Sequence, residues 1–103
     1  MITAIVQFRL PAPVSREQAR SIFEGSAPNY RNMPGLVRKY YLLSEDERTA
    51  GGAYLWESRA AAEAVYDDAW RRTVTERYGA EPSVAYFESP VVVDNETGEI
   101  LID

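Results

Sequence analysis

Lysine occurs once in this sequence, at position 39, whereas the other ten basic residues are arginines. Lys39 lies in a run of aliphatic and aromatic residues, where removal from water lowers the pKa of an ammonium group. Such an amine can stabilise a substrate oxyanion or form a Schiff base with a carbonyl compound. A strand lysine can also extend its charged end past a sheet edge or pair with a carboxylate. From the sequence, both interpretations stay open.

Aromatic side chains accompany this lysine and continue into the second half of the chain. Their rings can line a flat pocket for a planar ligand, with phenol groups as orienting hydrogen-bond donors. Most of them are expected to pack in the core or between subunits, and only a few to face a cavity. The polar segment 28–34 is a candidate lip over such a pocket, with Asn29 and Tyr30 as donors. The aromatic candidates are Tyr40, Tyr41, Tyr54, Trp56, Tyr66, Trp70, Tyr78 and Tyr86.

Two residue types that commonly carry chemistry are absent, because the chain has neither cysteine nor histidine. Their absence excludes Ser-His-Asp and Cys-His mechanisms, thiolate metal sites and histidine-bound zinc or haem. The adjacent acids Asp67 and Asp68 are typical of a solvated surface and would make a weak metal site. We therefore expect no metal site, and chemistry limited to lysine, tyrosine, arginine, carboxylates, asparagine, tryptophan, the backbone or a borrowed cofactor.

Hydrophobic periodicity and capping signals predict the elements that position these residues. The predicted strands cover residues 2–10, 36–43, 52–57 and 84–88, and the predicted helices cover residues 15–27 and 59–78. The first helix could also continue irregularly as far as Met33. Ser15 with Gln18 forms a capping-box pattern, and Ser58 is a candidate N-cap. Asp67-Asp68 predicts a bend that divides the second helical stretch into two shorter helices, and Gly79 predicts the end of that stretch. Residues 91–103 are expected to form a C-terminal extension or hairpin.

The pair Gly51-Gly52 lies at the predicted start of the third strand. Glycine in a strand pattern marks either a close approach of the backbone to a ligand or a bulge or twist of the sheet, and the second explanation is favoured. No glycine-rich phosphate-binding motif is present.

The element order βαββαβ predicts an α+β fold, the ferredoxin-like sandwich with an antiparallel sheet. Neither strand of the central hairpin, residues 35–57, has a clean polar face, so both faces of the sheet are expected to be covered. A chain with helices enough for one face can cover the other with a second copy of itself. The sequence therefore predicts a homodimer.

Length and charge limit the function further. A chain of 103 residues is expected to form a single domain, residues 1–103, with 91–103 as its extension. A formal net charge of −5 disfavours nucleic acid as a partner. The apolar runs are too short for a membrane helix and the N-terminus lacks a signal-peptide pattern, so we expect no membrane association and a cytoplasmic location.

A specific motif runs through the central hairpin. It consists of Pro34-Gly35, Lys39 followed by aromatic residues, Ser44-Glu45, and Ala50-Gly51-Gly52-x-Tyr54-Leu55 followed by an aromatic residue. The pattern resembles the YdhR-type mono-oxygenase family within the dimeric α+β barrel superfamily, most clearly over residues 34–66. The resemblance implies a ferredoxin-like protomer that pairs with a second copy to form a closed barrel.

By analogy with cofactor-free enzymes of that superfamily, the resemblance also implies a mono-oxygenase that needs no cofactor and acts on a small aromatic, phenolic or quinol-like compound. Lys39 would stabilise the substrate anion, Tyr54 and Tyr41 would donate hydrogen bonds, and Trp56 and Trp70 would wall the pocket. The alternative is a non-catalytic dimer of the same fold that binds or senses a small ligand. An isomerase or a lactone-forming enzyme would need a well-placed acid or base, which the sequence does not identify.

Overall fold

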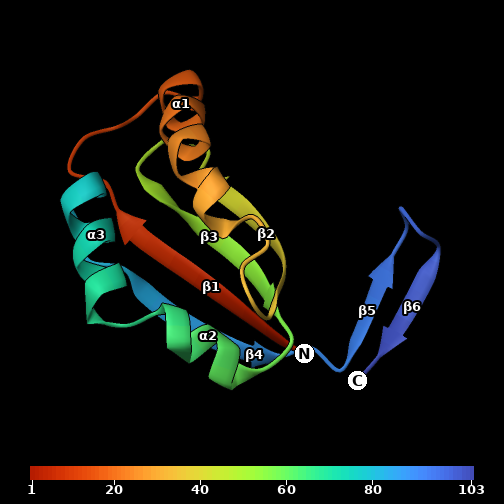
Figure 1. Ribbon diagram of the computed structural model, residues 1–103. Helices are drawn as coiled ribbons and strands as arrows, with labels where there is room; N and C mark the ends of the chain where they lie inside the picture. The colour runs from red at the N-terminus through yellow and green to blue at the C-terminus, as the bar shows by residue number, and fades with distance from the viewer.

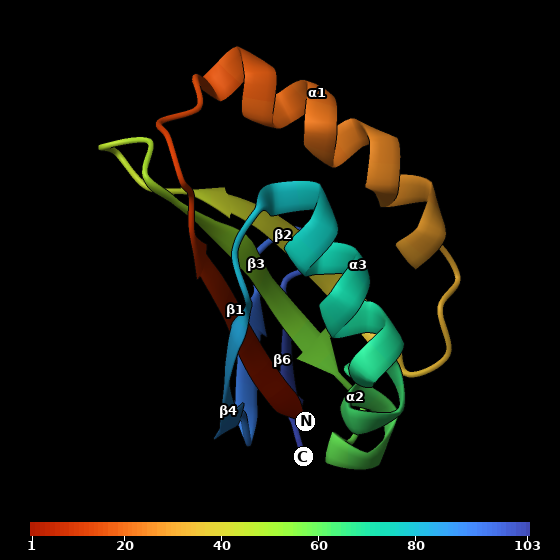
Figure 2. The same ribbon diagram turned by 90° about the vertical axis from the view of Figure 1, so that its left-hand side faces the viewer.

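A computed structural model describes residues 1–103 of the protein. A four-stranded antiparallel sheet forms its centre, with strands in the order β2-β3-β1-β4, and a separate β-hairpin stands apart from it (Figure 1). The helices gather on one side of the four-stranded sheet (Figure 2). In chain order the elements are β1 (Ile2–Arg9), α1 (Arg16–Ser26), the 3₁₀ helix η1 (Ala27–Tyr30), β2 (Leu36–Leu43), β3 (Thr49–Trp56), α2 (Arg59–Val65), α3 (Asp68–Tyr78), β4 (Ser83–Glu88), β5 (Val91–Asp94) and β6 (Glu99–Ile102).

The order of these elements confirms the predicted ferredoxin-like α+β fold.

Local capping explains where the helices begin. Ser15 Oγ accepts from the backbone N–H of Gln18 at 3.1 Å, and the Gln18 side chain accepts from the Ser15 N–H at 3.0 Å, so the capping box is complete. Ser58 accepts from the N–H of Ala61 at 3.1 Å and begins α2 in the same way.

The two shorter helices predicted on either side of Asp67-Asp68 are present as α2 and α3. The side chain of Asp67 accepts a 2.8 Å hydrogen bond from the N–H of Trp70 and so caps a new helix, α3. Gly79 ends α3 in the left-handed conformation, with φ of 74°, which costs glycine little because it has no Cβ. The break lets α2 and α3 cover different parts of the sheet (Figure 2).

The third strand begins earlier than the sequence indicated. It runs from Thr49, so Gly51-Gly52 lies inside β3 and not at its start. The pairing of β2 with β3 is shifted only between Leu36 and Arg38, so the glycines form no bulge, and of the favoured explanations only a twist of the sheet stays open. The two cross-strand pairs that matter for the site are Lys39 with Tyr54 and Tyr41 with Gly52.

The two faces of the sheet differ in their burial. The face toward the helices carries buried residues such as Val6 and Trp56, which are 2% and 0% exposed. The opposite face carries no helix, and its aromatic side chains Tyr40 and Phe87 are 55% and 57% exposed. A hairpin formed by β5 and β6 is held near this face by an ion pair of 3.0 Å between Arg38 and Asp94. No helix is long and apolar enough to cross a membrane.

Candidate functional site

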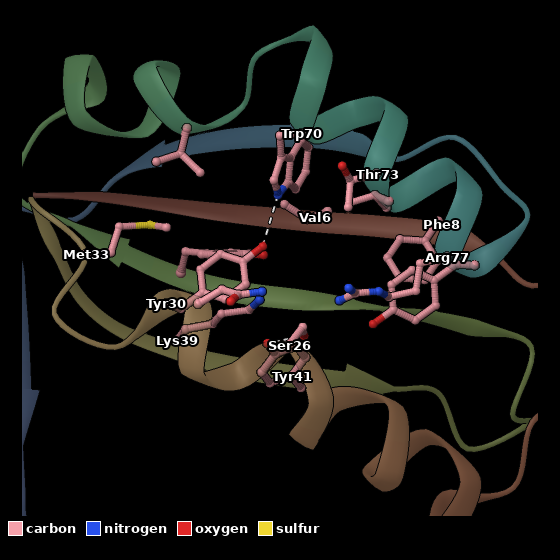
Figure 3. Close-up of a pocket in the computed structure, with 16 residues that line it drawn as sticks. Val6, Phe8, Ser26, Tyr30, Met33, Lys39, Tyr41, Trp70, Thr73 and Arg77 are labelled. Carbon is pink, nitrogen blue, oxygen red and sulfur yellow. Dashed lines mark hydrogen bonds between the residues drawn. The ribbon is translucent and has the colours of Figure 1, made fainter.

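A cavity of about 190 Å³ lies between the sheet and the helices. Figure 3 shows it between α3 on one side and α1 with η1 on the other, with the strands beneath. Its residues come from β1, β2, β3 and all these helical segments, so only the folded chain assembles it. The lining residues are Val6, Phe8, Ser26, Asn29, Tyr30, Met33, Lys39, Tyr41, Gly51, Tyr54, Val65, Trp70, Thr73, Val74, Arg77 and Tyr78.

Lys39 extends from β2 into this cavity, where three aromatic rings surround its amine. The Nζ atom lies 3.4 Å from the centroid of the Tyr30 ring, 3.8 Å from that of Tyr41 and 4.6 Å from that of Tyr54. Lys39 takes part in no ion pair. The interpretation of Lys39 as a lysine paired with a carboxylate is therefore excluded, and it lies beside a cavity, as a functional role requires.

The environment of Lys39 lowers the pKa of its amine to near neutral pH. Burial, and to a smaller extent the positive charge of Arg77, lower the pKa of Lys39 to about 7. The electron-rich faces of the surrounding rings act in the opposite direction, because they favour the charged ammonium. Near neutral pH the amine can therefore accept a proton or hold it.

Two tyrosines predicted to be donors also line the cavity. Burial, followed by the neighbouring phenols, raises the pKa of Tyr54 far above its usual value. Burial likewise raises the pKa of Tyr41, whose hydroxyl lies 2.7 Å from the hydroxyl of the buried Ser26. Both phenols keep their protons near neutral pH, so they can donate hydrogen bonds but cannot serve as bases.

The predicted lip of the pocket is present as η1 and the residues that follow it. The Trp70 indole N–H donates a 3.0 Å hydrogen bond to the hydroxyl of Tyr30, shown as the dashed line in Figure 3. This bond joins α3 to η1 across the cavity. Asn29 also lines the cavity, and its side chain is largely exposed.

Trp56, expected from the sequence to wall the pocket, lies elsewhere. Its side chain is 0% exposed and does not line the cavity. Its indole N–H donates a 3.1 Å hydrogen bond to the hydroxyl of Tyr66, and its ring stacks against that of Tyr54 at a centroid distance of 6.0 Å. Trp56 therefore supports Tyr54 from within the core.

Sequence reasoning missed several residues of the site, chiefly Ser26, Met33, Thr73 and Arg77. Helical periodicity held part of the signal, because Thr73 and Arg77 follow Trp70 at intervals of three and seven residues and so share its face. The cavity has no lining carboxylate, and no cluster of three or more acidic residues in the chain could hold a metal ion.

Glycines 51 and 52 allow close packing around the lysine. A Cβ at Gly51 would clash with the backbone oxygen of Val6, so any side chain there would require the strands to move. A Cβ at Gly52 would lie 2.9 Å from Cε1 of Tyr54 and 3.3 Å from Cε of Lys39. The absence of a side chain at Gly52 therefore leaves room for the two central residues of the site.

The antiparallel sheet with its helices on one face defines a ferredoxin-like α+β protein. Over residues 4–85 the sequence matches the family described as "Putative mono-oxygenase ydhR". This match covers most of the chain, which therefore belongs to that family, as its hairpin motif indicated. No curated protein matches the sequence closely enough to serve as a relative.

Solved structures with the same fold include two oxygenases. One is the monooxygenase of ActVA-Orf6 from Streptomyces coelicolor in complex with nanaomycin D, with a TM-score of 0.65 and 20% identity over 85% of this chain and 86% of that chain. The other is SnoaB, a cofactor-independent oxygenase from Streptomyces nogalater, with a TM-score of 0.61 and 18% identity over 85% of this chain and 91% of that chain. At these identities the similarity shows a shared fold.

Proposed function

We propose that this protein is a cofactor-independent mono-oxygenase that acts on a small aromatic, phenolic or quinol-like compound in the cavity beside Lys39. One observation carries the proposal: an amine with a pKa of about 7 lies among aromatic rings inside a cavity. Membership of the mono-oxygenase family and the fold shared with a cofactor-independent oxygenase support it.

In the first step, neutral Lys39 accepts a proton from the hydroxyl group of the substrate. A base is most effective when its pKa lies near the working pH, which holds for Lys39 at neutrality. The reaction produces an ammonium and a phenolate side by side, a pair that attracts strongly in surroundings of low dielectric. The rings of Tyr30 and Tyr41 further stabilise the new ammonium.

The neighbouring phenols orient the substrate anion. Tyr54 and Tyr41 stay protonated because of their raised pKa values, so they can donate hydrogen bonds to a developing oxyanion. The aromatic rings of Tyr30 and Trp70 provide flat surfaces for the substrate ring.

In the second step, the electron-rich substrate anion itself reduces dioxygen. For a substrate with a ring CH₂ group, one oxygen atom becomes a carbonyl at that carbon. The second oxygen atom leaves as water together with the two hydrogens of that carbon, and Lys39 returns its proton to the hydroxyl oxygen of the product. The substrate supplies all the electrons, so the balanced reaction requires no external reductant. The protein contributes the base, the donors and exclusion of water.

The proposal is tested by oxygen uptake with a panel of phenols and quinols in the absence of added cofactor. The native protein is compared with Lys39→Met, which removes the amine but keeps an unbranched side chain. Arg48→Met is the matched control, because it removes one positive charge from a residue outside the cavity. Saturable uptake by the native protein and by Arg48→Met, but not by Lys39→Met, is the expected result.

Uptake no faster than the uncatalysed reaction for every compound would contradict the proposal. Ligand binding without turnover would then favour the alternative of a small-ligand-binding or sensing protein.

We also propose that the active form is a homodimer joined through the sheet face that carries no helix. The support is the exposed apolar surface of that face, including Tyr40 and Phe87, which would be unusual to leave in water. A second copy placed there would complete the barrel implied by the sequence motif.

A further inference from the structure

The residues lining the cavity have an unusual balance of charge for this protein. The chain contains 16 acidic and 11 basic residues, yet the cavity is lined by two basic residues and by no acidic residue. The basic residues are Lys39 from β2 and Arg77 from α3. Their positively charged ends share the space between these elements in Figure 3, with Lys39 inside and Arg77 more exposed to solvent.

Neither of these cations has a carboxylate partner within the chain. The ion pairs of the protein join Arg20 with Glu24, Arg38 with Asp94, Arg59 with Glu63, and the N-terminus with Asp103. Lys39 and Arg77 therefore repel one another without compensation, and the charge of Arg77 disfavours the ammonium form of Lys39. An anion between them would interact favourably with both.

We propose that the cavity binds aromatic carboxylates, with the carboxylate held between Lys39 and Arg77 and the ring among Tyr30, Tyr54 and Trp70. The proposal rests on the proposed function for the location of the site and specifies its ligand class. It concerns binding, and it requires no turnover. With such a carboxylate bound, Lys39 carries its proton, so it would stabilise the anion of a neighbouring hydroxyl and would not act as the base for that hydroxyl.

The size of the cavity limits the ring system. Pockets for drug-sized ligands typically occupy about 300–1,000 Å³, and this cavity of about 190 Å³ is smaller. One ring or two fused rings with a carboxylate are therefore the expected size class. The guanidinium of Arg77 can hold the carboxylate of such a ligand through two hydrogen bonds.

Binding of an anion should also change the protonation of Lys39. The groups that face its amine are Tyr30 from η1, Tyr41 from β2, Tyr54 from β3 and Arg77 from α3, and none is a carboxylate. A bound carboxylate would thus be the only anion next to the amine. It would raise the pKa of Lys39, so the protein should take up a proton on binding.

The test compares 2-naphthoate with its neutral analogue 2-naphthamide by isothermal titration calorimetry at pH 6.5. We expect the carboxylate to bind at least about tenfold more tightly, the ratio that corresponds to one charged hydrogen bond. Lys39→Met and Arg77→Met should each reduce this ratio to about twofold or less, since each removes one of the two charges. Arg77→Lys should restore part of it, and Arg72→Met, on α3 but outside the cavity, should leave it unchanged.

A second measurement uses the single lysine of the chain. In protein labelled with ¹³C-lysine, Lys39 gives the only lysine signal, so its pKa can be read directly by NMR. Saturation with 2-naphthoate should raise this pKa by at least about one unit, which corresponds to a tenfold change, and 2-naphthamide should not raise it. Equal affinity for the two probes, or a preference for the carboxylate that survives Arg77→Met, would overturn the proposal.

The two proposals can fail separately. Carboxylate-selective binding without oxygen uptake from any phenol would contradict the oxygenase and support the anion site. Lysine-dependent oxidation of neutral phenols without any preference for 2-naphthoate would support the oxygenase and contradict the anion site.

Discussion

The amine of Lys39 lies 3.4 Å from the centroid of the Tyr30 ring, which joins strand β2 to the helical lip η1. Tyr30 in turn accepts a hydrogen bond from Trp70 on α3 at 3.0 Å. One tyrosine thus contacts the titrating group of the site through its ring and the opposite wall through its hydroxyl. The ring and the hydroxyl can be removed separately by mutation.

Substitution of Tyr30 should separate these two contacts. Tyr30→Phe removes the acceptor of the Trp70 bond and should lower the free energy of unfolding by about 1 kcal/mol. Because it retains the ring, it should change the pKa of Lys39 little. Tyr30→Leu also removes the aromatic face that favours the ammonium, and should lower the pKa of Lys39 by about half a unit to one unit. NMR titration of the single lysine and urea unfolding measure both effects, and equal pKa values in the two variants would contradict the role of the ring.

The stability of the protein should depend on pH through Lys39. Below about pH 7 both the folded and unfolded states carry the proton, and the folded state bears the full cost of an ammonium in the cavity. Between about 7 and the ordinary lysine value of 10.5, the unfolded state binds more protons, so the free energy of unfolding increases with pH. Urea unfolding at a series of pH values should show this rise, and Lys39→Met should abolish it. If the free energy of unfolding of the variant rises with pH as in the native protein, the rise is due to other titratable groups.

At higher pH the tyrosines should reverse the trend. Burial raises the pKa of Tyr78 to about 12 and raises those of Tyr54 and Tyr66 further. Above about pH 10 the unfolded state loses phenol protons that the folded state keeps, so the free energy of unfolding falls. Absorbance at the tyrosinate band during alkaline titration should show these phenols ionising only as the protein unfolds. Ionisation of all tyrosines near pH 10 in the folded protein would contradict their burial.

The two glycines of β3 should respond differently to alanine. Gly51→Ala places a Cβ against the backbone of Val6, so the strands must move, and the free energy of unfolding should fall by about 3 kcal/mol. Gly52→Ala meets mainly the side chains of Tyr54 and Lys39 and one backbone oxygen, and should cost about 1 kcal/mol while displacing the amine. Urea unfolding and the Lys39 NMR titration distinguish the two outcomes. A larger loss of stability in Gly52→Ala would contradict this ranking.

The hydrogen bond between Trp56 and Tyr66 should affect stability without affecting ligand binding. Tyr66→Phe leaves the buried indole N–H of Trp56 without a partner, which should cost about 1–3 kcal/mol. Tyr66 does not line the cavity, so the affinity for 2-naphthoate should stay within about twofold of the native value. Calorimetric titration below the melting temperature tests this expectation. Loss of binding in a folded variant would show that Trp56 and Tyr66 contribute to the binding site.

The proposed dimer should depend on the sheet face that carries no helix. Tyr40→Glu together with Phe87→Glu places charges on that face and should convert a dimer to a monomer, as measured by size-exclusion chromatography with light scattering. Ile22→Glu is the control, since Ile22 is an exposed apolar residue of α1. A native protein that stays monomeric at high concentration, or a double variant that still dimerises, would contradict the proposed interface.

Elements whose ends depend on local contacts could be predicted from the amino-acid sequence. Ser15 with Gln18, Ser58, Asp67 and Gly79 each act within a few residues, so their roles could be predicted without the fold. The start of β3 was misplaced because pairing with β1 and β2 extends the strand back to Thr49. Pairing of this kind depends on neighbours far away in the chain.

For the site, the sequence identified Lys39 as the residue to examine, and alternation placed it on one strand face with Tyr41. Alternation does not say which face the helices cover. It places Trp56 on the same strand face as Tyr54, so both were predicted to line the pocket. Packing between elements buries Trp56 in the core and brings Arg77, from a distant helix, into the same cavity as Lys39. The reason is physical: a pKa and a cavity depend on burial and on charges across the fold, and both are set by packing between elements.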